Sequence, residues 1–433
     1  MAGKVPPRGG GSTHRPPALR SGFSTGTAAS AAAMAALRLL LTGTTAEAMA
    51  VRLPSGVYLG VPVAGGSLED GTGCARVIKD GGDDPDVTNG AEIRARVTIF
   101  CDTSQDSAKA PELVVFAGTG IGTVTKPGLP ALPGEPAINP GPRQMISENI
   151  TLEILRSDRS ALVPLLQKAP PRGWDGTGKP ALRLPLCTAQ APFLPLNLPD
   201  GFTIAIEIEA PKGEELARHT LNPRLGVLGG ISILGTTGLV RPFSHEAYEE
   251  TIQAAFSVAA SNSRSDCVVL STGGKSERFS RQMLPELAPE AFVQIADFFR
   301  FAVLEAVKFG FSRIIHSVFF GKAVKMALGH PYTHAHAAPL DLEFLASTAR
   351  ELGRDANTCA KLAAANTARH ALDILAEGGS CDVVASIARK AAEESARLTG
   401  GACRIRLLLF DYDGNLLADV TPPDVQSNRE AVL

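Results

Sequence analysis

The chain has 433 residues, 44% of them hydrophobic and 20% charged, and a formal net charge of -2. A chain of this length and composition can bury a large core and is expected to form two domains, which excludes a mainly disordered protein. A net charge near zero argues against sequence-independent binding to nucleic acid, and the lack of a run of about 18 uncharged apolar residues argues against a membrane span, so we expect a soluble, cytoplasmic protein.

The first part of the sequence predicts a tail followed by an α+β domain with a mixed sheet. Residues 1–18 are rich in Pro and Gly and poor in apolar side chains, which predicts a disordered tail. Residues 27–41 are almost entirely Ala, Leu and Met, which favour a helix, and Gly43 is suited to end it. The remainder of a domain over residues 19–211 consists of proline-rich loops at 119–143 and 170–199 and of strands at 57–63, 75–79, 93–100, 113–117, 150–155 and 202–208.

After Pro211 longer strands alternate with longer helices, which predicts an α/β domain with a mainly parallel sheet over residues 212–433. Ser244 is placed to cap its first helix, and the apolar residues between Phe292 and Val307 recur at helical spacing. Ligands of such open sheets bind at the carboxyl ends of the strands. The other predicted elements are strands at 226–234, 267–270 and 313–320, packed helices over 341–398 and a terminal hairpin over 404–420.

Two glycine-rich motifs follow predicted strands. The run Val114–Gly122 would precede a helix in an ordinary Rossmann methyltransferase, but Lys126-Pro127 and the prolines after it forbid a helix, so that fold is not expected. The run Val269–Ser276 resembles a phosphate-binding loop, but Val269 stands where the first glycine is required. We therefore favour an anion-binding or cofactor-binding turn at 271–276, with a plain β-to-α connection as the alternative.

Acidic and histidine clusters supply the other candidate sites. The turn Lys79–Asp86 concentrates four carboxylates and one amine, and it is either a solvated turn or a site that faces a cation such as a sulfonium. His330, His334 and His336 have no acidic or Cys residue beside them, so we favour ligand contact or loop hydrogen bonding over a metal site. The seven cysteines are scattered without a Cys-X-X-Cys pair. We expect no protein-bound metal.

Several blocks of the sequence, in one order from about Leu19 to Val420, resemble the CbiD family. The family usually has Cys where this chain has Ala28, and often Ser where it has Ala335, so neither side chain can be essential here. The blocks that carry the resemblance are Arg20–Thr27, Lys79–Thr88, Gly122–Pro130, Gly134–Pro140, Asn222–Gly226, Gly229–Gly238, Ser271–Arg278, and Gly321-Lys322 through Thr333-His334.

The resemblance implies an S-adenosylmethionine-dependent methylation of C1 of cobalt-precorrin-5B, giving cobalt-precorrin-6A, in anaerobic cobalamin biosynthesis. The cobalt would then belong to the tetrapyrrole substrate. Methyl transfer from a sulfonium is an in-line displacement, so alignment of the reactants, which can supply roughly 7–11 kcal/mol, should be the main contribution of the protein. A nucleotide-dependent phosphotransferase and a noncatalytic tetrapyrrole-binding protein remain alternatives, and a homo-oligomer is left open.

On this interpretation, the acids of the 79–86 turn serve catalysis, glycine-rich turns hold the cofactor, and cations hold the carboxylates at the edge of the macrocycle. The expected catalytic residues are Asp80, Asp83 and Asp84. The expected cofactor-binding residues are Ser24, Thr25, Gly26, Thr27, Gly229, Gly230, Gly235, Thr236, Thr237, Gly238, Thr272, Gly273 and Gly274. The expected substrate-binding residues are Lys79, Lys126, Arg143, Arg224, Arg241, Lys275, Arg278, Lys322 and His334.

Overall fold

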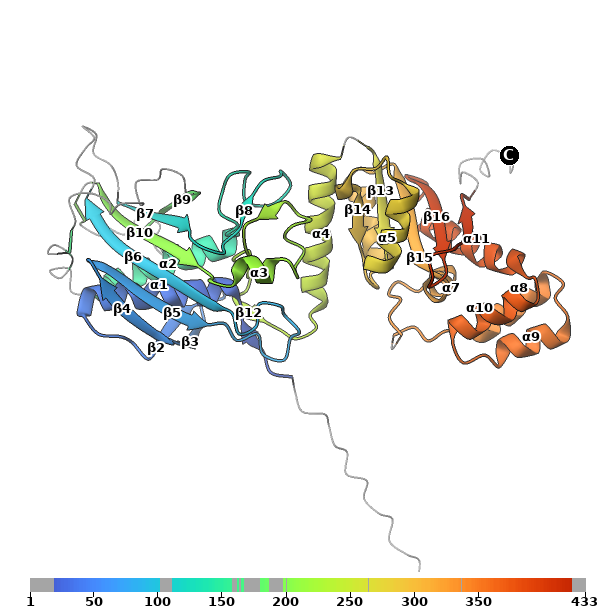
Figure 1. Cartoon of the computed structure of the whole chain (residues 1–433), viewed down its shortest axis with the longest axis horizontal. Helices are drawn as coiled ribbons and strands as arrows, with labels where there is room; N and C mark the ends of the chain where they lie inside the picture. Colours follow the sequence, from blue (N-terminus) through green and yellow to red (C-terminus); the bar gives the residue numbers. More distant parts are fainter. Residues whose placement is uncertain are drawn as a thin grey trace, which may run out of the picture.

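The computed structural model describes residues 19–101, 111–157, 162, 165–166, 180–186, 198–199, 201–263, 265–335 and 337–422. The predicted tail at 1–18 lies outside these residues. Figure 1 shows one sheet and its helices in the left half of the molecule, and a second sheet and its helices in the right half. The helix α4 (His245–Asn262) lies between the two halves. We call residues 19–240 the N-terminal part and residues 241–422 the C-terminal part.

The N-terminal part is built on a mixed sheet, as the sequence predicts. Its strand order is β4-β5-β6-β10-β7-β9, and only β10 and β7 run parallel. The strands are β4 (Gly65–Glu69), β5 (Thr72–Ile78), β6 (Glu92–Cys101), β10 (Phe202–Glu209), β7 (Glu112–Ala117) and β9 (Ala181–Pro185). A separate hairpin is formed by β2 (Ala48–Arg52) and β3 (Tyr58–Pro62), and α3 (Gly213–Ala217) follows β10.

The alanine-rich helix α1 (Thr25–Thr42) packs against β5, β6 and α2 (Pro140–Arg156). Ser24 caps its start and Gly43, in the left-handed conformation, ends it. By length and composition alone α1 would suit a membrane span, which the sequence analysis did not anticipate. However, 83% of that stretch is buried inside the fold, so α1 serves as a core helix.

Three sequence predictions are wrong in this region and the next. Residues 150–155, expected as a strand, lie in α2, where Ile146, Ile150 and Ile154 follow one another at helical spacing and are all buried. Of the strand expected at 226–234, only β11 (Val227–Leu228) forms, and it pairs with β8 (Thr123–Val124). The strand ends there because the glycines after it turn the chain. The loop expected at 170–199 contains β9, and its other residues lie mostly outside the described part.

The C-terminal part is built on a sheet of order β14-β13-β15-β16-β17, in which the first four strands are parallel and β17 is antiparallel. This confirms the mainly parallel sheet. The run 292–307, expected as one helix, is instead β14 (Phe292–Gln294) followed by α6 (Phe299–Lys308), with Ala296 in a positive-φ conformation between them. The other strands are β13 (Cys267–Ser271), β15 (Arg313–Phe319), β16 (Arg404–Phe410) and β17 (Leu416–Val420).

The connections of this sheet leave its central strands in opposite directions. From β13 the chain passes through α5 (Gly274–Met283) to β14 on one side, and from β15 it passes through α7 (Phe320–Ala327) and further helices to β16 on the other. Open α/β sheets bind their ligands at the carboxyl ends of the strands where such a reversal occurs. The further helices are α8 (Leu342–Glu351), α9 (Ala356–Ala363), α10 (Ala368–Glu377) and α11 (Cys381–Leu398).

The buried apolar residues form two main cores. The first runs from Phe23 to Ile233, and the second runs from Ile252 to Leu409. A division into two domains remains our proposal. The separation of the cores supports a boundary between Ile233 and Ile252, downstream of the one proposed near Pro211 from the sequence.

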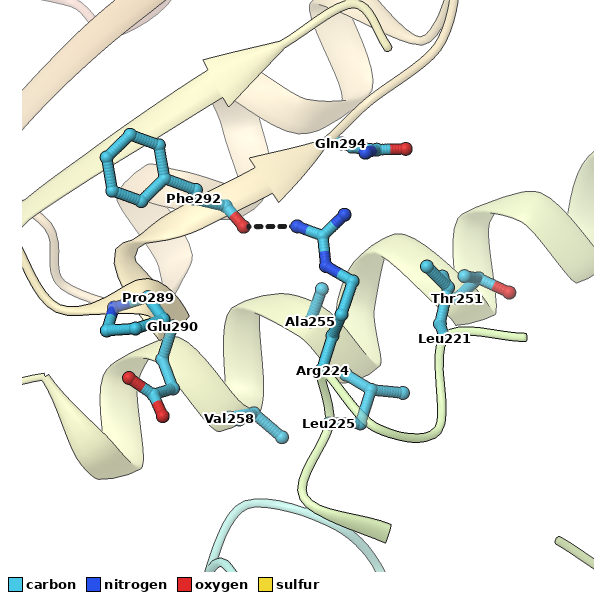
Figure 2. A pocket seen from close by; sticks show the side chains of 10 residues that line it. All are labelled: Leu221, Arg224, Leu225, Thr251, Ala255, Val258, Pro289, Glu290, Phe292 and Gln294. Atoms are coloured by element: carbon cyan, nitrogen blue, oxygen red, sulfur yellow. Dashed lines mark hydrogen bonds between the residues drawn. The ribbon is translucent and has the colours of Figure 1, made fainter. Parts of the chain in front are cut away.

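The two parts meet along α4. Gly128, with φ +108°, lies so close to it that an added Cβ would be 2.6 Å from Ser257 O, so only glycine fits. Lys126 forms an ion pair with Glu290, and Arg224 Nη2 donates to Glu277 Oε2 at 2.8 Å and to Phe292 O at 3.1 Å. Figure 2 shows Arg224 reaching past α4 toward Phe292.

Arg224→Gln should therefore weaken the junction. Glu277, only 6% exposed, would lose one of its charged donors, which should lower the free energy of unfolding by about 1–3 kcal/mol. Urea unfolding measures this, with Arg278→Gln, an exposed cation on the same helix as Glu277, as the control. If the variant has wild-type stability but binds the ligand more weakly, Arg224 binds substrate, as the sequence predicts, and does not stabilise the junction.

His316, in the middle of β15, is buried in the second core. Its Nε2 lies 2.7 Å from Ser395 Oγ, and within the described residues its Nδ1 has no hydrogen-bond partner. Burial lowers the pKa of His316 from 6.5 to about 3. The side chain therefore stays neutral in the folded protein at a pH where the unfolded chain takes up a proton.

Because the folded pKa is lowered, the stability that His316 contributes is complete above pH 6.5 and is lost as the pH falls toward about 3. Between about pH 7 and about pH 5 the free energy of unfolding should fall by about 2 kcal/mol on this account. In urea titrations, His316→Gln should remove this dependence, whereas the exposed His219→Gln should keep it. The same pH slope in all three proteins would contradict the assignment.

Candidate functional site

The turn after β13 is open to solvent. Thr272, Gly273 and Gly274 join β13 to α5 at the carboxyl edge of the parallel sheet. A Cβ added at Gly273 would meet no atom within 4 Å, and at Gly274 the nearest atom would be Gln294 Nε2 at 3.6 Å. In the described part of the chain, the backbone N–H groups of Gly274 and Lys275 have no acceptor, and both residues are exposed. The turn can therefore receive a ligand at its backbone donors.

Aromatic side chains flank this turn on the side of β15 and β16. Phe319, the last residue of β15, stacks on Tyr412 with ring centroids 4.8 Å apart and planes at 17°. Lys275 Nζ lies 6.0 Å from the centre of the Tyr412 ring, which is 40% exposed. These residues provide a flat apolar surface and a cation beside the open backbone of the glycine turn.

A charged cluster lies at the same edge, after β14 and β15. Lys322, in the first turn of α7, forms an ion pair with Asp297, which follows β14. Asp297 Oδ1 also accepts from Thr333 Oγ1 at 3.0 Å, and Lys325 Nζ donates to Thr333 O at 2.9 Å. The loop around Thr333 is thus fastened to the carboxyl edge of the sheet.

A group of aromatic rings lies between this charged cluster and the start of α4. Tyr332 lies with its ring centroid 5.0 Å from that of Phe298 and 4.9 Å from that of His245. Tyr248 stacks on Phe298 at 5.8 Å, and His334 stacks on Tyr332 at 6.0 Å. These contacts join the loop after α7 to the first turns of α4, which Figure 1 shows at the lower end of that helix.

The acidic turn borders this region through its contact with residue 243. Asp84 Oδ1 accepts from the backbone N–H of Phe243 at 3.0 Å. Asp80 pairs with Arg20, and the hydrogen bond from that guanidinium is the main reason why the pKa of Asp80 is lowered. Asp83 Oδ2 accepts from the backbone N–H of Arg20 at 2.6 Å. Each of the three expected catalytic carboxylates therefore has a partner within the protein.

Lys79 lies beneath the acidic turn, away from solvent. It is 2% exposed, and its Nζ lies 2.6 Å from Asp86 Oδ2. The ion pair between Lys79 and Asp86 stabilises the conformation of the turn. Because Lys79 is buried, its side chain cannot contact a large substrate.

The start of α1 is packed against the loop that ends at Gly238. The backbone N–H of Ser24 donates to Gly238 O at 3.0 Å, that of Gly26 donates to Leu234 O at 2.8 Å, and Thr27 Oγ1 donates to Gly238 O at 2.6 Å. Ser24, Thr25 and Thr27 are all buried. The structure brings these two expected cofactor segments together but uses their polar groups on each other. The antiparallel pair β1 (Gly22–Phe23) and β12 (Leu239–Val240) extends the same contact.

Within the loop 229–238, the expected cofactor residues divide into exposed and packed ones. Gly229, Thr236 and Thr237 are exposed, whereas Gly230 is buried against Gly120. Gly235 is partly buried beside Ser24. Most of these glycines therefore allow backbone segments of the N-terminal part to approach one another.

Some of the expected substrate-binding cations form ion pairs within the protein, and others are exposed. Lys126 and Arg224 tie the two parts together, and Arg143 pairs with Glu135 at 2.6 Å. Arg241, Lys275 and Arg278 are exposed. Only Lys275 and Lys322 join Thr272–Gly274 at the carboxyl edge of the sheet.

Several residues at this edge were missed in the sequence analysis. Asp297 was assigned to a helix expected over 292–307, although an acid shortly after a run of apolar residues was a usable signal. Phe298, Tyr332 and Tyr412 gave no periodic signal, because their proximity depends on tertiary contacts.

Among the described residues, no group of three or more His, Cys, Asp or Glu side chains could hold a metal ion. His336 lies outside them. A hollow at the junction, drawn in Figure 2, is lined by Arg224, Glu290 and Gln294 among others and has a volume of about 30 Å³. That volume suits a few ordered waters, not a nucleoside or a macrocycle.

Comparison with known proteins supplies the family. The family model described as CbiD matches residues 12–166 and 189–242, and the model described as CbiD, C-terminal domain, matches residues 332–421. A solved structure of cobalamin biosynthesis protein (cbiD) from Archaeoglobus fulgidus is 27% identical, with a TM-score of 0.34, covering 71% of this chain and 79% of that one.

Two curated relatives carry the name cobalt-precorrin-5B C(1)-methyltransferase. The protein of Nitratidesulfovibrio vulgaris is 40% identical over 408 residues, which cover 92% of each chain. The protein of Geobacillus kaustophilus is 35% identical over 406 residues, which cover 94% of this chain and 96% of the relative. Similarity of this extent spans both sheets, and the chain belongs to the CbiD family.

Proposed function

We propose that this protein methylates C1 of cobalt-precorrin-5B with S-adenosylmethionine, the reaction for which its relatives are named. The observation that carries the proposal is the 40% identity over 92% of both chains, because it includes the N-terminal part, the junction and the C-terminal sheet. A relative that shared only one part would not support the same activity.

The proposed binding place of the methyl donor is the edge of the sheet at the carboxyl ends of β13 and β15. The exposed N–H groups of Gly274 and Lys275 can hold a carboxylate or a hydroxyl, and the Phe319–Tyr412 pair can hold a flat base. S-adenosylmethionine supplies an electrophilic methyl group on a sulfonium. The role of Thr272–Gly274 is to orient the donor so that the methyl group faces an acceptor carbon.

The acidic turn remains our proposal for catalysis. Asp83 is the most exposed of its three expected acids, and Asp84 contacts Phe243, close to the aromatic rings of α4. Carboxylates at this place can favour a nearby positive charge or accept a proton. Nothing in the geometry favours the phosphotransferase alternative, since Val269 is a buried strand residue where a phosphate loop needs glycine.

A single-turnover assay tests the function. The protein is mixed without oxygen with cobalt-precorrin-5B and methyl-labelled S-adenosylmethionine. We expect one labelled methyl group at C1 of the macrocycle for each S-adenosylhomocysteine formed. Folded protein that transfers no label, or that consumes ATP in its place, would refute the proposal.

Gly273→Ala tests the proposed donor site without disturbing the fold. The backbone at Gly273 is extended, with φ 164°, and an added Cβ has free space, so stability should be nearly unchanged. A methyl group in the turn should reduce S-adenosylmethionine affinity at least about tenfold by calorimetry, because it blocks close approach to the backbone.

The matched control is Gly60→Ala, which also has free space and lies in β3. It should leave the affinity unchanged. Equal affinity in wild type and Gly273→Ala would move the donor away from this turn.

A further inference from the structure

Two ammonium groups lie close to one carboxylate, Asp297, at the carboxyl edge of the sheet, and one of them pairs with it. Lys322 pairs with Asp297, while Lys325 donates to a backbone oxygen, Thr333 O, at 2.9 Å. The side chain of Lys322 is 26% exposed and that of Asp297 is 16% exposed, whereas Lys325 is buried. The cluster therefore holds one positive charge in excess, and Lys322 is its accessible member.

The excess charge is costly in the free protein. Burial, with a further effect of Lys325, lowers the pKa of Lys322 to about 8, and burial also lowers the pKa of Lys325. Two partly desolvated cations beside the single carboxylate of Asp297 favour an incoming carboxylate. Among the described residues, the other titratable groups beside the cluster include His330 and His334 in the same loop, His245 against Tyr332, and Arg300 at the start of α6.

A group of aromatic rings adjoins this cation. Thr333, which bonds to Asp297, stands between Tyr332 and His334, whose rings stack. Tyr332 contacts His245, and both His245 and Tyr248 are exposed at the start of α4. Such rings suit a planar unsaturated ligand with charged groups at its edge.

We infer that Tyr332, His245 and Lys322 form the face that holds the macrocycle, with its ring system packed against the aromatic side chains and one edge carboxylate bound to Lys322. The substrate class rests on the proposed function. The incoming carboxylate accepts from Lys322 beside Asp297, which keeps its ion pair with Lys322 and its bond from Thr333, so that two carboxylates then face the two ammonium groups. This places the macrocycle beside the turn at Gly273, across the same edge of the sheet.

Uroporphyrin III, a stable tetrapyrrole polycarboxylate, serves as the probe, and its absorption shift measures binding to the full-length protein. Lys322→Gln should weaken binding at least about tenfold, because a charge-assisted hydrogen bond is lost. Lys361→Gln, the same change at an exposed position of α9, should leave binding unchanged.

The pH profile separates a direct role of Lys322 from a structural one. Wild-type affinity should fall as the pH rises through about 8, since Lys322 then loses its charge. Lys322→Arg should bind at neutral pH and lose this alkaline fall, because arginine stays charged. Tyr332→Leu, which leaves the charges in place, should weaken binding without changing the pH profile.

Unchanged affinity in folded Lys322→Gln and Tyr332→Leu would overturn the inference. So would a wild-type enzyme that methylates cobalt-precorrin-5B with a KM that Lys322→Gln does not raise, although the proposed function would then stand. Binding of the probe through Lys322 without any methyl transfer would uphold the binding face and overturn the function.

Discussion

The relation between the two sheets depends on one buried carboxylate. Glu277 of α5 accepts from Arg224 of the N-terminal part, from Arg281 of its own helix at 2.7 Å and from Gln294 of β14 at 2.9 Å. A buried charge is tolerated only when it is bonded in this way. Because α5 begins at the open glycine turn, the bond to Arg224 also fixes that turn relative to the N-terminal part.

Glycine-rich motifs of this chain have two different physical roles that the sequence does not distinguish. Glycine permits close approach both of a ligand and of another backbone segment. At Gly22 a Cβ would collide with the backbone of the acidic turn, and at Gly230 it would collide with Gly120. Gly273 alone of the three has free space around it. Only tertiary contacts separate the packing role from the binding role.

Elements with strong local signals were predicted well from the sequence, and elements that depend on context were not. The alanine-rich α1, the apolar β13 and the Ser244 cap of α4 carry their own signals, and all three form. Ile150–Leu155 could be read with either period, and only its packing against α1 makes it part of α2.

The roles of the expected substrate-binding cations also could not be predicted from the sequence alone. Lys126, Arg224 and Lys322 were indistinguishable in the sequence as candidate ligands of a polyacid. In the structure the first two bridge the N-terminal and C-terminal parts, and the third lies at the sheet edge beside a loop of aromatic residues. Whether a cation is available to a ligand depends on charged partners that are far away in the sequence, and a single sequence does not reveal these partners.

The central claim is that methyl donor and macrocycle meet at the carboxyl ends of β13 and β15. A crystal structure with S-adenosylhomocysteine bound tests it most directly. The account predicts the adenosyl group against Phe319 and Tyr412, with its amino-acid end at the Gly273–Gly274 turn and its sulfur facing the Tyr332 loop. Density for the nucleoside on the N-terminal sheet, with the Gly273 turn empty, would contradict it.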